Sequence, residues 1–159
     1  MKKLLNRLTD WWHNRLRLRG LIFKGYGEAS KTLHHQSPHL KKYLPDLENY
    51  YLATINVMLE KPVQFNGYAA VTPWLKWKKD YPPESFLFVA CEIETKHNRC
   101  RAFIYIPSNS PHTASCHKWE VIAEESLPFI TTGEEITLIF DYPHYSTKYA
   151  ACIGGETRI

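Results

Sequence analysis

Residues 85–107 read SFLFVACEIETKHNRCRAFIYIP, and this stretch decides the fold. Two runs rich in β-branched and aromatic residues, 85–95 and 100–107, flank the polar tetrapeptide Lys-His-Asn-Arg at 96–99. Apolar runs of this length around a short polar segment are typical of a β-hairpin. The stretch therefore predicts two long antiparallel strands at the centre of the domain.

The two faces of the predicted hairpin differ in character. If Thr95 pairs with Cys100, Glu94 faces Arg101 as a favourable cross-strand pair. One face is then wholly apolar and belongs to the core: it carries Val89, Cys91, Ile93, Ala102, Ile104 and Ile106. The other face mixes aromatic and charged side chains: Phe86, Phe88, Glu92, Glu94, Arg101, Phe103 and Tyr105.

Further strands are expected on both sides of the hairpin, from alternation with a period of two. They cover residues 50–60 (where helix is a competing interpretation), 63–71, 118–124, 136–140 and 147–153, with a turn at 143–146. About seven short strands with frequent turns predict an α+β fold that is mainly antiparallel β, either a sandwich or a small barrel.

The N-terminal segment predicts one basic amphipathic helix over residues 2–19. Leu5, Leu8, Trp12 and Leu16 recur at helical spacing, and Gly20 is a plausible stop. Residues 20–38 are rich in Gly, Ser and Pro and predict a loop. We therefore expect residues 1–45 to form a helix-and-loop segment and residues 46–159 to form the β domain.

Charge is distributed unevenly along the chain. The 159 residues carry a net charge of +4. Residues 1–24 hold seven basic residues and one acidic residue, a net charge of +6, and the remainder carries 13 basic and 15 acidic residues, a net charge of −2. Such an asymmetry is typical of an interaction segment. An anionic membrane surface is one conceivable, less favoured target of residues 2–19.

The compartment expected from the sequence is the cytoplasm. Polar residues interrupt any apolar signal region near the N-terminus. The cysteines show no Cys-x-x-Cys spacing and are expected to be reduced thiols: Cys91, Cys100, Cys116 and Cys152.

The favoured functional interpretation is a non-catalytic protein-interaction module of the adaptor, inhibitor or immunity type. Four of the five Trp residues lie in two short stretches bordered by Lys or Arg, and Trp, Tyr and Arg dominate interface energies. The residues expected to contact a partner protein are Trp11, Trp12, Arg15, Arg17, Trp74 and Trp77.

The alternative is a single-stranded nucleic-acid-binding protein on an OB-like barrel. Aromatic rings stack on bases and lysines neutralise phosphates in such grooves. Besides Trp74 and Trp77, the groove would be lined by Lys76, Lys78, Lys79, Arg101, Phe103 and Tyr105.

Histidines support a third interpretation, a small hydrolase. His35 and His144 each precede a serine by two residues, a pattern found in phosphoesterases that use paired histidines as acid and base. The clusters His34–His35–His39 and His112–Cys116–His117 offer zinc ligands but lack the spacing of a structural site. No cofactor, metal or catalytic residue is expected.

Overall fold

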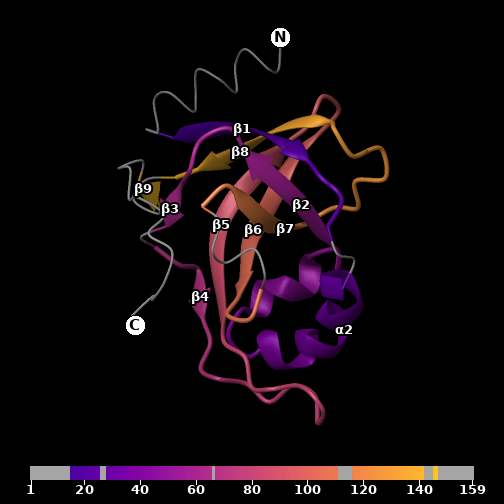
Figure 1. Cartoon of the computed structure of the whole chain (residues 1–159), viewed down its shortest axis with the longest axis vertical. Coiled ribbons are helices and arrows are strands. Elements are labelled where there is room, and N and C mark those ends of the chain that lie inside the picture. Colours follow the sequence, from indigo (N-terminus) through magenta and orange to yellow (C-terminus); the bar gives the residue numbers. More distant parts are fainter. Residues whose placement is uncertain (1–14, 26–27, 66, 111–115, 142–144, 147–159) are drawn as a thin grey trace.

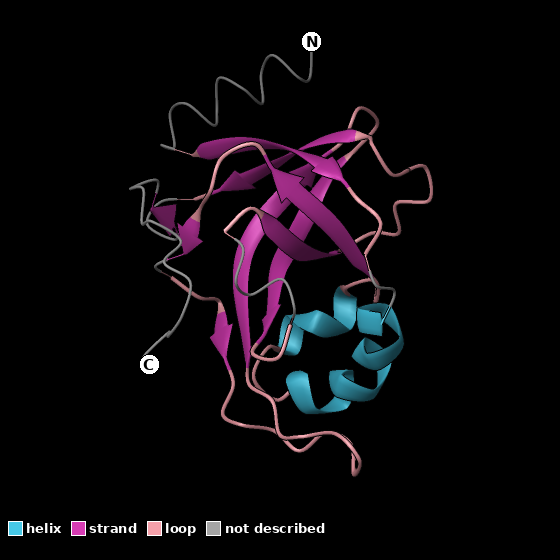
Figure 2. Ribbon diagram, viewed as in Figure 1, coloured by secondary structure: helices cyan, strands magenta, loops and turns pink. Residues whose placement is uncertain are grey.

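A computed structural model of the chain describes residues 15–25, 28–65, 67–110, 116–141 and 145–146. Its strands curl into a barrel, and the helices pack together beside one part of it (Figures 1 and 2). The elements in chain order are β1 (Leu16–Ile22), α2 (Glu28–Leu40), the 3-10 helix η1 (Pro45–Asn49), β2 (Thr54–Leu59), β3 (Gln64–Phe65), β4 (Ala70–Val71), β5 (Phe86–Glu94), β6 (Arg99–Pro107), β7 (Lys118–Ala123), β8 (Glu135–Phe140) and β9 (Tyr145–Ser146).

The main sheet is entirely antiparallel, and its strand order is β4-β5-β6-β7-β2-β1-β8. An additional pairing of β5 with β8 closes six of these strands into a barrel, with β4 as an extra strand beside β5. The predicted α+β class, mainly antiparallel with a small barrel, is confirmed. Of the two architectures expected, the barrel is the one formed.

The predicted hairpin exists as β5 and β6, but its register differs by two residues. Glu94 pairs with Arg99 and Glu92 with Arg101, so the expected pairing of Glu94 with Arg101 is wrong. The reason is Thr95, which ends the hairpin instead of pairing within it: its hydroxyl accepts hydrogen bonds from the backbone N–H groups at residues 97 and 98. Because the shift is even, the two faces keep their predicted residues.

The helix predicted over residues 2–19 is wrong at its C-terminal end, where Leu16–Ile22 forms β1. Leu18 and Ile22 point inward, and Arg19 and Leu21 are exposed. This alternation competes with the helical spacing, and pairing to both β2 and β8 decides in favour of the strand. Gly20 is a mid-strand residue: a Cβ there would lie 2.9 Å from the Met58 carbonyl oxygen. The rest of the predicted helix lies outside the described residues.

The loop predicted over residues 20–38 is also wrong, because most of it forms β1 and α2. Leu33 and Leu40 are fully buried, and they lie on one face of α2 with the buried Gln36. A polar sequence with an internal Pro38 gives a weak helical signal. Packing onto the barrel supplies the stabilisation that intrinsic propensity lacks.

Two apolar cores lie on opposite faces of the same strands. The barrel interior includes Val57, Val89, Ile93, Ile104 and Leu138. The second core forms where α2 and η1 cover the outer face of β5, β6 and β7, and it contains Leu33, Leu40, Leu47, Phe86, Phe88, Phe103, Tyr105 and Ile122. The aromatic half of the mixed hairpin face is therefore buried beneath helices.

The remaining strand predictions have different outcomes. The strand expected over 50–60 is confirmed as β2, and those expected over 118–124 and 136–140 are confirmed as β7 and β8. The strand expected over 63–71 is two short strands, β3 and β4. Tyr145 and Ser146, expected in a turn, form β9 against β3. The strand expected over 147–153 lies outside the described residues.

The cysteines are not uniformly reduced. Cys91 and Cys100 are buried free thiols, whereas Cys116 is disulfide-bonded, which corrects the expectation for that residue. Cys152 lies outside the described residues. Disulfide formation depends on Cα separation in space, which sequence spacing does not determine.

The expected division near residue 45 runs between elements that contact each other closely. β1 shares its hydrogen bonds with β2 and β8, which lie on the other side of that boundary in the sequence. Within the described ranges, every helix is too short or too polar to cross a membrane.

The strand assignment of β1 predicts opposite behaviour for two leucines. Leu18→Ala opens a cavity inside the barrel, because Leu18 is 6% exposed, and should lower the free energy of unfolding by about 2–4 kcal/mol. Leu21→Ala, at a side chain 44% exposed, should change it by less than about 1 kcal/mol. Urea denaturation measures both. Equal losses at the two positions would contradict the strand.

Candidate functional site

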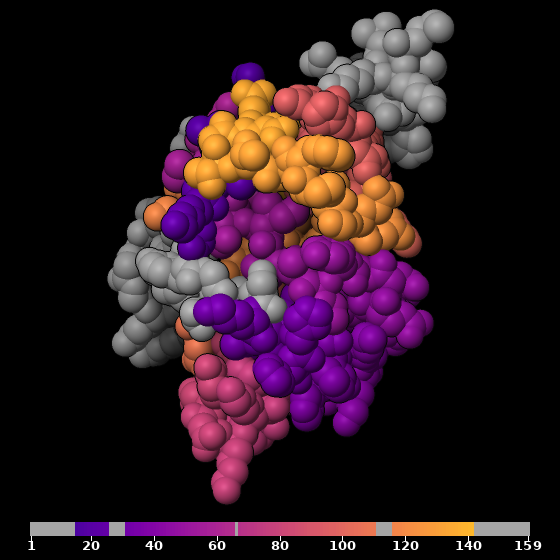
Figure 3. Space-filling view, turned by 90° about the vertical axis from the view of Figure 1, so that its right-hand side faces the viewer, coloured from indigo at the N-terminus to yellow at the C-terminus, as the bar shows by residue number. Residues whose placement is uncertain are grey.

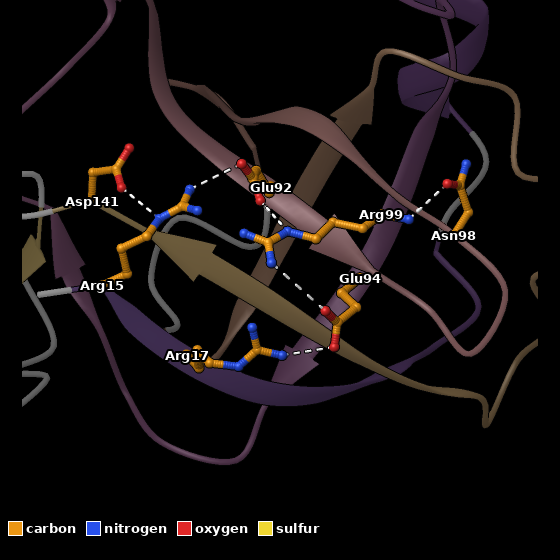
Figure 4. Close-up of polar contacts among 7 residues, drawn as sticks. All are labelled: Arg15, Arg17, Glu92, Glu94, Asn98, Arg99 and Asp141. Atoms are coloured by element: carbon orange, nitrogen blue, oxygen red, sulfur yellow. Dashed lines mark hydrogen bonds and ion pairs between the residues drawn. The ribbon is translucent and has the colours of Figure 1, made fainter. Parts of the chain in front are cut away.

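An ionic cluster, here called the arginine clasp, lies on the outer surface of the barrel (Figure 4). Its three cations and three carboxylates come from β1, β5, β6 and the segments beside them, and they balance in charge: Arg15, Arg17, Arg99, Glu92, Glu94 and Asp141. Arg15 Nη2 lies 3.0 Å from Glu92 Oε1, and Arg17 Nη2 lies 2.7 Å from Glu94 Oε1. Arg99 pairs with Glu92 and approaches Glu94.

The clasp spans β8 at the seam that closes the barrel. Ile139 of β8 pairs with Arg17 on one side and with Glu92 on the other. Ile139 is fully buried although it lies outside the barrel's interior core. The clasp residues Arg17 and Glu92 thus flank this buried side chain on both sides, and arginine stems can cover apolar surface of this kind.

Two of the residues expected to bind a partner, Arg15 and Arg17, thus form ion pairs within this chain. The side chains of Arg15 and Arg17 are 15% and 23% exposed, and both are paired with carboxylates of this chain. Their positive charge is neutralised in place. Trp11 and Trp12 lie outside the described residues.

The other predicted contact stretch forms a defined loop, here called the aromatic loop, over residues 72–84. Its two tryptophans have opposite environments: Trp74 is 62% exposed and Trp77 is 7% exposed. Trp77 Nε1 donates a hydrogen bond of 3.3 Å to the buried Glu84, and its ring lies 4.7 Å from that of Tyr81. Trp77 is therefore the anchor of the loop, and Trp74 is the residue that the loop presents.

The residues expected to line a nucleic-acid groove are not brought together. Lys76, Lys78 and Lys79 are exposed on the aromatic loop. Phe103 and Tyr105 are 5% and 2% exposed beneath the helices, so neither ring offers a face to a base in this structure. Arg101 is exposed on β6, and its Nε donates to Glu124 at 3.1 Å.

Three buried polar groups lie in or next to this loop, and the sequence singled out only Tyr105 among them. Glu84 accepts hydrogen bonds from Trp77 and from the Asn109 backbone N–H, and burial raises its pKa. Tyr105 donates its hydroxyl proton to Gln36 at 2.6 Å. On β7, Glu120 pairs in register with Tyr105. Burial, and secondarily the charge of Glu84, raise the pKa of Glu120 to about 7.

Two carboxyls whose environments raise their pKa values are a pattern found at acid–base sites. Here the adjoining cavity, lined by Tyr105 and Glu120 among others, measures about 10 Å³. That volume holds about one water molecule. The cluster can therefore take up a proton near neutral pH, but it offers no room for an organic substrate in this structure.

The histidines that supported the hydrolase interpretation do not form a site among the described residues. His34 and His35 lie on the exposed side of α2, whereas Gln36 and Ser37 of the same helix are buried. A ring nitrogen of His117 lies 3.1 Å from the Leu59 carbonyl oxygen. His112 and His144 lie outside the described residues. The described residues hold no group of three His, Cys, Asp or Glu side chains arranged to bind a metal ion.

No family model matches the chain, and no curated protein matches it in sequence.

The clasp predicts unequal effects at two outward-facing arginines of β1. The Arg17–Glu94 pair is 23% and 16% exposed, and the Arg19–Glu60 pair is 63% and 50% exposed. Arg17→Ala leaves a less exposed carboxylate without this partner and should lower the free energy of unfolding by about 1–2 kcal/mol, against about 0.5 kcal/mol or less for Arg19→Ala. Chemical denaturation in low salt measures both. Equal losses of unfolding free energy in the two variants would show that the clasp stabilises the fold no more than an exposed ion pair does.

Glu120 predicts a loss of stability as pH rises. Its pKa is raised from 4.5 to about 7, so the folded state holds the proton more tightly than the unfolded state. Stability is then full below about pH 4.5 and declines as pH rises through about 7. The shift corresponds to about 3 kcal/mol, so Glu120→Gln should be more stable than wild type by up to that amount at pH 8 and equal to it at pH 4.5.

Urea denaturation across this range is the measurement, with the exposed Glu135→Gln as the matched control. A wild-type pH profile in Glu120→Gln would contradict the assignment.

Proposed function

We propose that this protein is an interaction module of the adaptor, inhibitor or immunity type that contacts a partner protein through the aromatic loop. The observation that carries the proposal is Trp74, an indole 62% exposed on a loop whose other tryptophan is buried. Tryptophan is the residue most enriched at the energetic centre of protein interfaces. Figure 3 shows residues 72–84, in rose, projecting at the lower end of the molecule.

The loop is held in shape before any partner arrives. Leu75 and Glu84 exchange backbone hydrogen bonds of 2.8 and 3.0 Å across it. At its base, the Thr72 hydroxyl accepts the Phe86 N–H at 2.9 Å. An ordered loop loses less conformational entropy on binding than a flexible one, which favours affinity.

Other exposed side chains on and beside the aromatic loop support a partner of complementary chemistry. Val71 and Tyr81 are 56% and 38% exposed, and the ammonium of Lys78 lies 4.8 Å from the centre of the Tyr81 ring. Lys76 donates a hydrogen bond to the Tyr81 carbonyl oxygen. A partner with an apolar pocket and an acidic rim complements this arrangement.

Single-stranded nucleic acid remains the second candidate, because exposed Trp74 and three exposed lysines share one loop. The burial of Phe103 and Tyr105 weakens it, since a strand would find one open ring and not a platform. We favour the protein partner for that reason.

The test replaces Trp74 with a photo-crosslinking phenylalanine analogue, with Tyr51, also exposed at 54%, as the control position. Crosslinking to one protein from position 74 and not from position 51 is the expected result. Trp74→Ala should then weaken binding of that purified partner by about 30-fold, the effect of a central interface tryptophan. Tyr51→Ala should leave binding unchanged.

Fluorescence anisotropy with labelled oligo-dT separates the second candidate. Binding that falls steeply with salt, with a smaller slope in Lys78→Ala/Lys79→Ala, would favour nucleic acid and overturn the protein proposal if position 74 crosslinks to no protein.

A further inference from the structure

The outer face of β1 and β2 carries an apolar pair that the helices leave uncovered. Leu21 of β1 and Met58 of β2 lie directly opposite each other in the sheet. They are 44% and 40% exposed, whereas α2 and η1 cover part of the outer face of β5, β6 and β7. Figure 1 shows β1 at the upper side of the barrel, apart from α2. Because directly opposed residues share one face of a sheet, the two side chains form a single patch.

Charged residues of opposite sign flank this pair on its two sides. On β7, Lys118 pairs in register with Met58. On β8, Glu135 pairs in register with Leu21. Both charged side chains are exposed. One row across four strands therefore carries, in spatial order, Lys118, Met58, Leu21 and Glu135.

The next row along the strands is also charged oppositely on its two sides. The Glu60 N–H of β2 donates to the Arg19 carbonyl oxygen of β1 at 2.9 Å, which continues the same register. The two side chains are 63% and 50% exposed for Arg19 and Glu60, and they lie 3.4 Å apart. On the other side of the apolar pair, Phe23 is half-buried, and the Lys118 ammonium lies 5.7 Å from the centre of its ring.

A two-fold axis that runs along the strands, midway between β1 and β2, makes this surface complementary to itself. Rotation about this axis turns a second copy face to face with the first and exchanges the β1 side of the face with the β2 side. Lys118 then faces Glu135 of the second copy, and Leu21 faces its Met58. The same rotation places Arg19 opposite Glu60. Because a two-fold interface uses one patch on both copies, each of these contacts forms twice.

We propose that the protein forms a two-fold homodimer through this face. Leu21 and Met58 supply the apolar centre of the interface, and the pairs between Lys118 and Glu135 lie at its rim, where they fix the register of the two copies. Two rows of side chains make a small interface, so we expect a weak dimer with a dissociation constant of about 10–100 µM.

Charge selects a second copy as the occupant of this face. Its four charged residues, two cations and two anions, sum to zero and match their own two-fold image. The partner proposed for the aromatic loop carries an acidic rim instead. Its carboxylates would face Glu60 and Glu135 as well as the cations, so the dimer face suits that partner poorly.

Sedimentation equilibrium of the full-length protein between about 5 and 500 µM, which brackets the expected constant, measures self-association. A reversible monomer–dimer equilibrium is expected. Leu21→Lys places a charge against Met58 of the second copy and should weaken the dimer at least about 10-fold. Phe129→Ala, at a side chain 74% exposed elsewhere, should leave it unchanged. A monomer at every concentration, or a dimer that Leu21→Lys leaves intact, would overturn the proposal.

Charge reversal tests the two-fold arrangement itself. Lys118→Glu alone and Glu135→Lys alone each bring like charges together twice per dimer and should weaken self-association at least about 10-fold. An equimolar mixture of the two variants should restore association, because opposite charges then face each other at both places. A mixture that associates no more tightly than either variant alone would overturn the proposal.

A matched pair of variants controls for net charge. Lys42→Glu and Glu48→Lys, at exposed residues beside the helices, change the net charge by the same amounts and should self-associate like the wild type, separately and mixed. Thermal unfolding of each variant verifies that it folds. Trp74→Ala should also dimerise like the wild type, so this outcome is independent of crosslinking at Trp74.

Discussion

The pairing of β5 with β8 is the constraint on which the other features depend. β5 pairs along its whole length with β6, while its N-terminal half pairs with β4 and its C-terminal half with β8. The side chains on the outward face of β5 also differ between its two halves. Phe86 and Phe88, in the N-terminal half, lie beneath the helices, and Glu92 and Glu94, in the C-terminal half, pair with arginines. One strand therefore joins an aromatic core to an ionic seam, and closure leaves the barrel without a free edge there.

The helical cover explains why the aromatic loop is ordered. α2 and η1 bury the outer face of the barrel over parts of β5, β6 and β7, and Trp77 joins the same core. Because Trp77 is fixed inside, the loop holds Trp74 outside. Two carboxyl groups, Glu84 and Glu120, are buried at this boundary, and burial raises the pKa of each.

The aromatic loop and the tip of the β5–β6 hairpin lie at opposite ends of the barrel. The aromatic loop is basic, and two carboxylates, Glu125 and Glu134, line a cavity beside the hairpin tip. Part of the basic N-terminal segment has a different role, because Arg15 and Arg17 are paired with carboxylates of the barrel. Part of the positive charge of the N-terminal segment is thus neutralised by carboxylates of this chain. Among the described residues, the basic surface best suited to a partner is the aromatic loop.

Local pattern determined the hairpin, its two faces and the strands β2, β7 and β8, because alternation with a period of two requires no knowledge of neighbours. It also located Trp74 on an exposed basic loop. Tertiary structure decided the rest. β1 is a strand because β2 and β8 pair with it, and α2 is a helix because Leu33 and Leu40 find an aromatic surface. Trp77 is buried although its neighbours resemble those of Trp74. The cavity beside Glu134 joins segments separated in sequence, so only closure of the barrel brings its walls together.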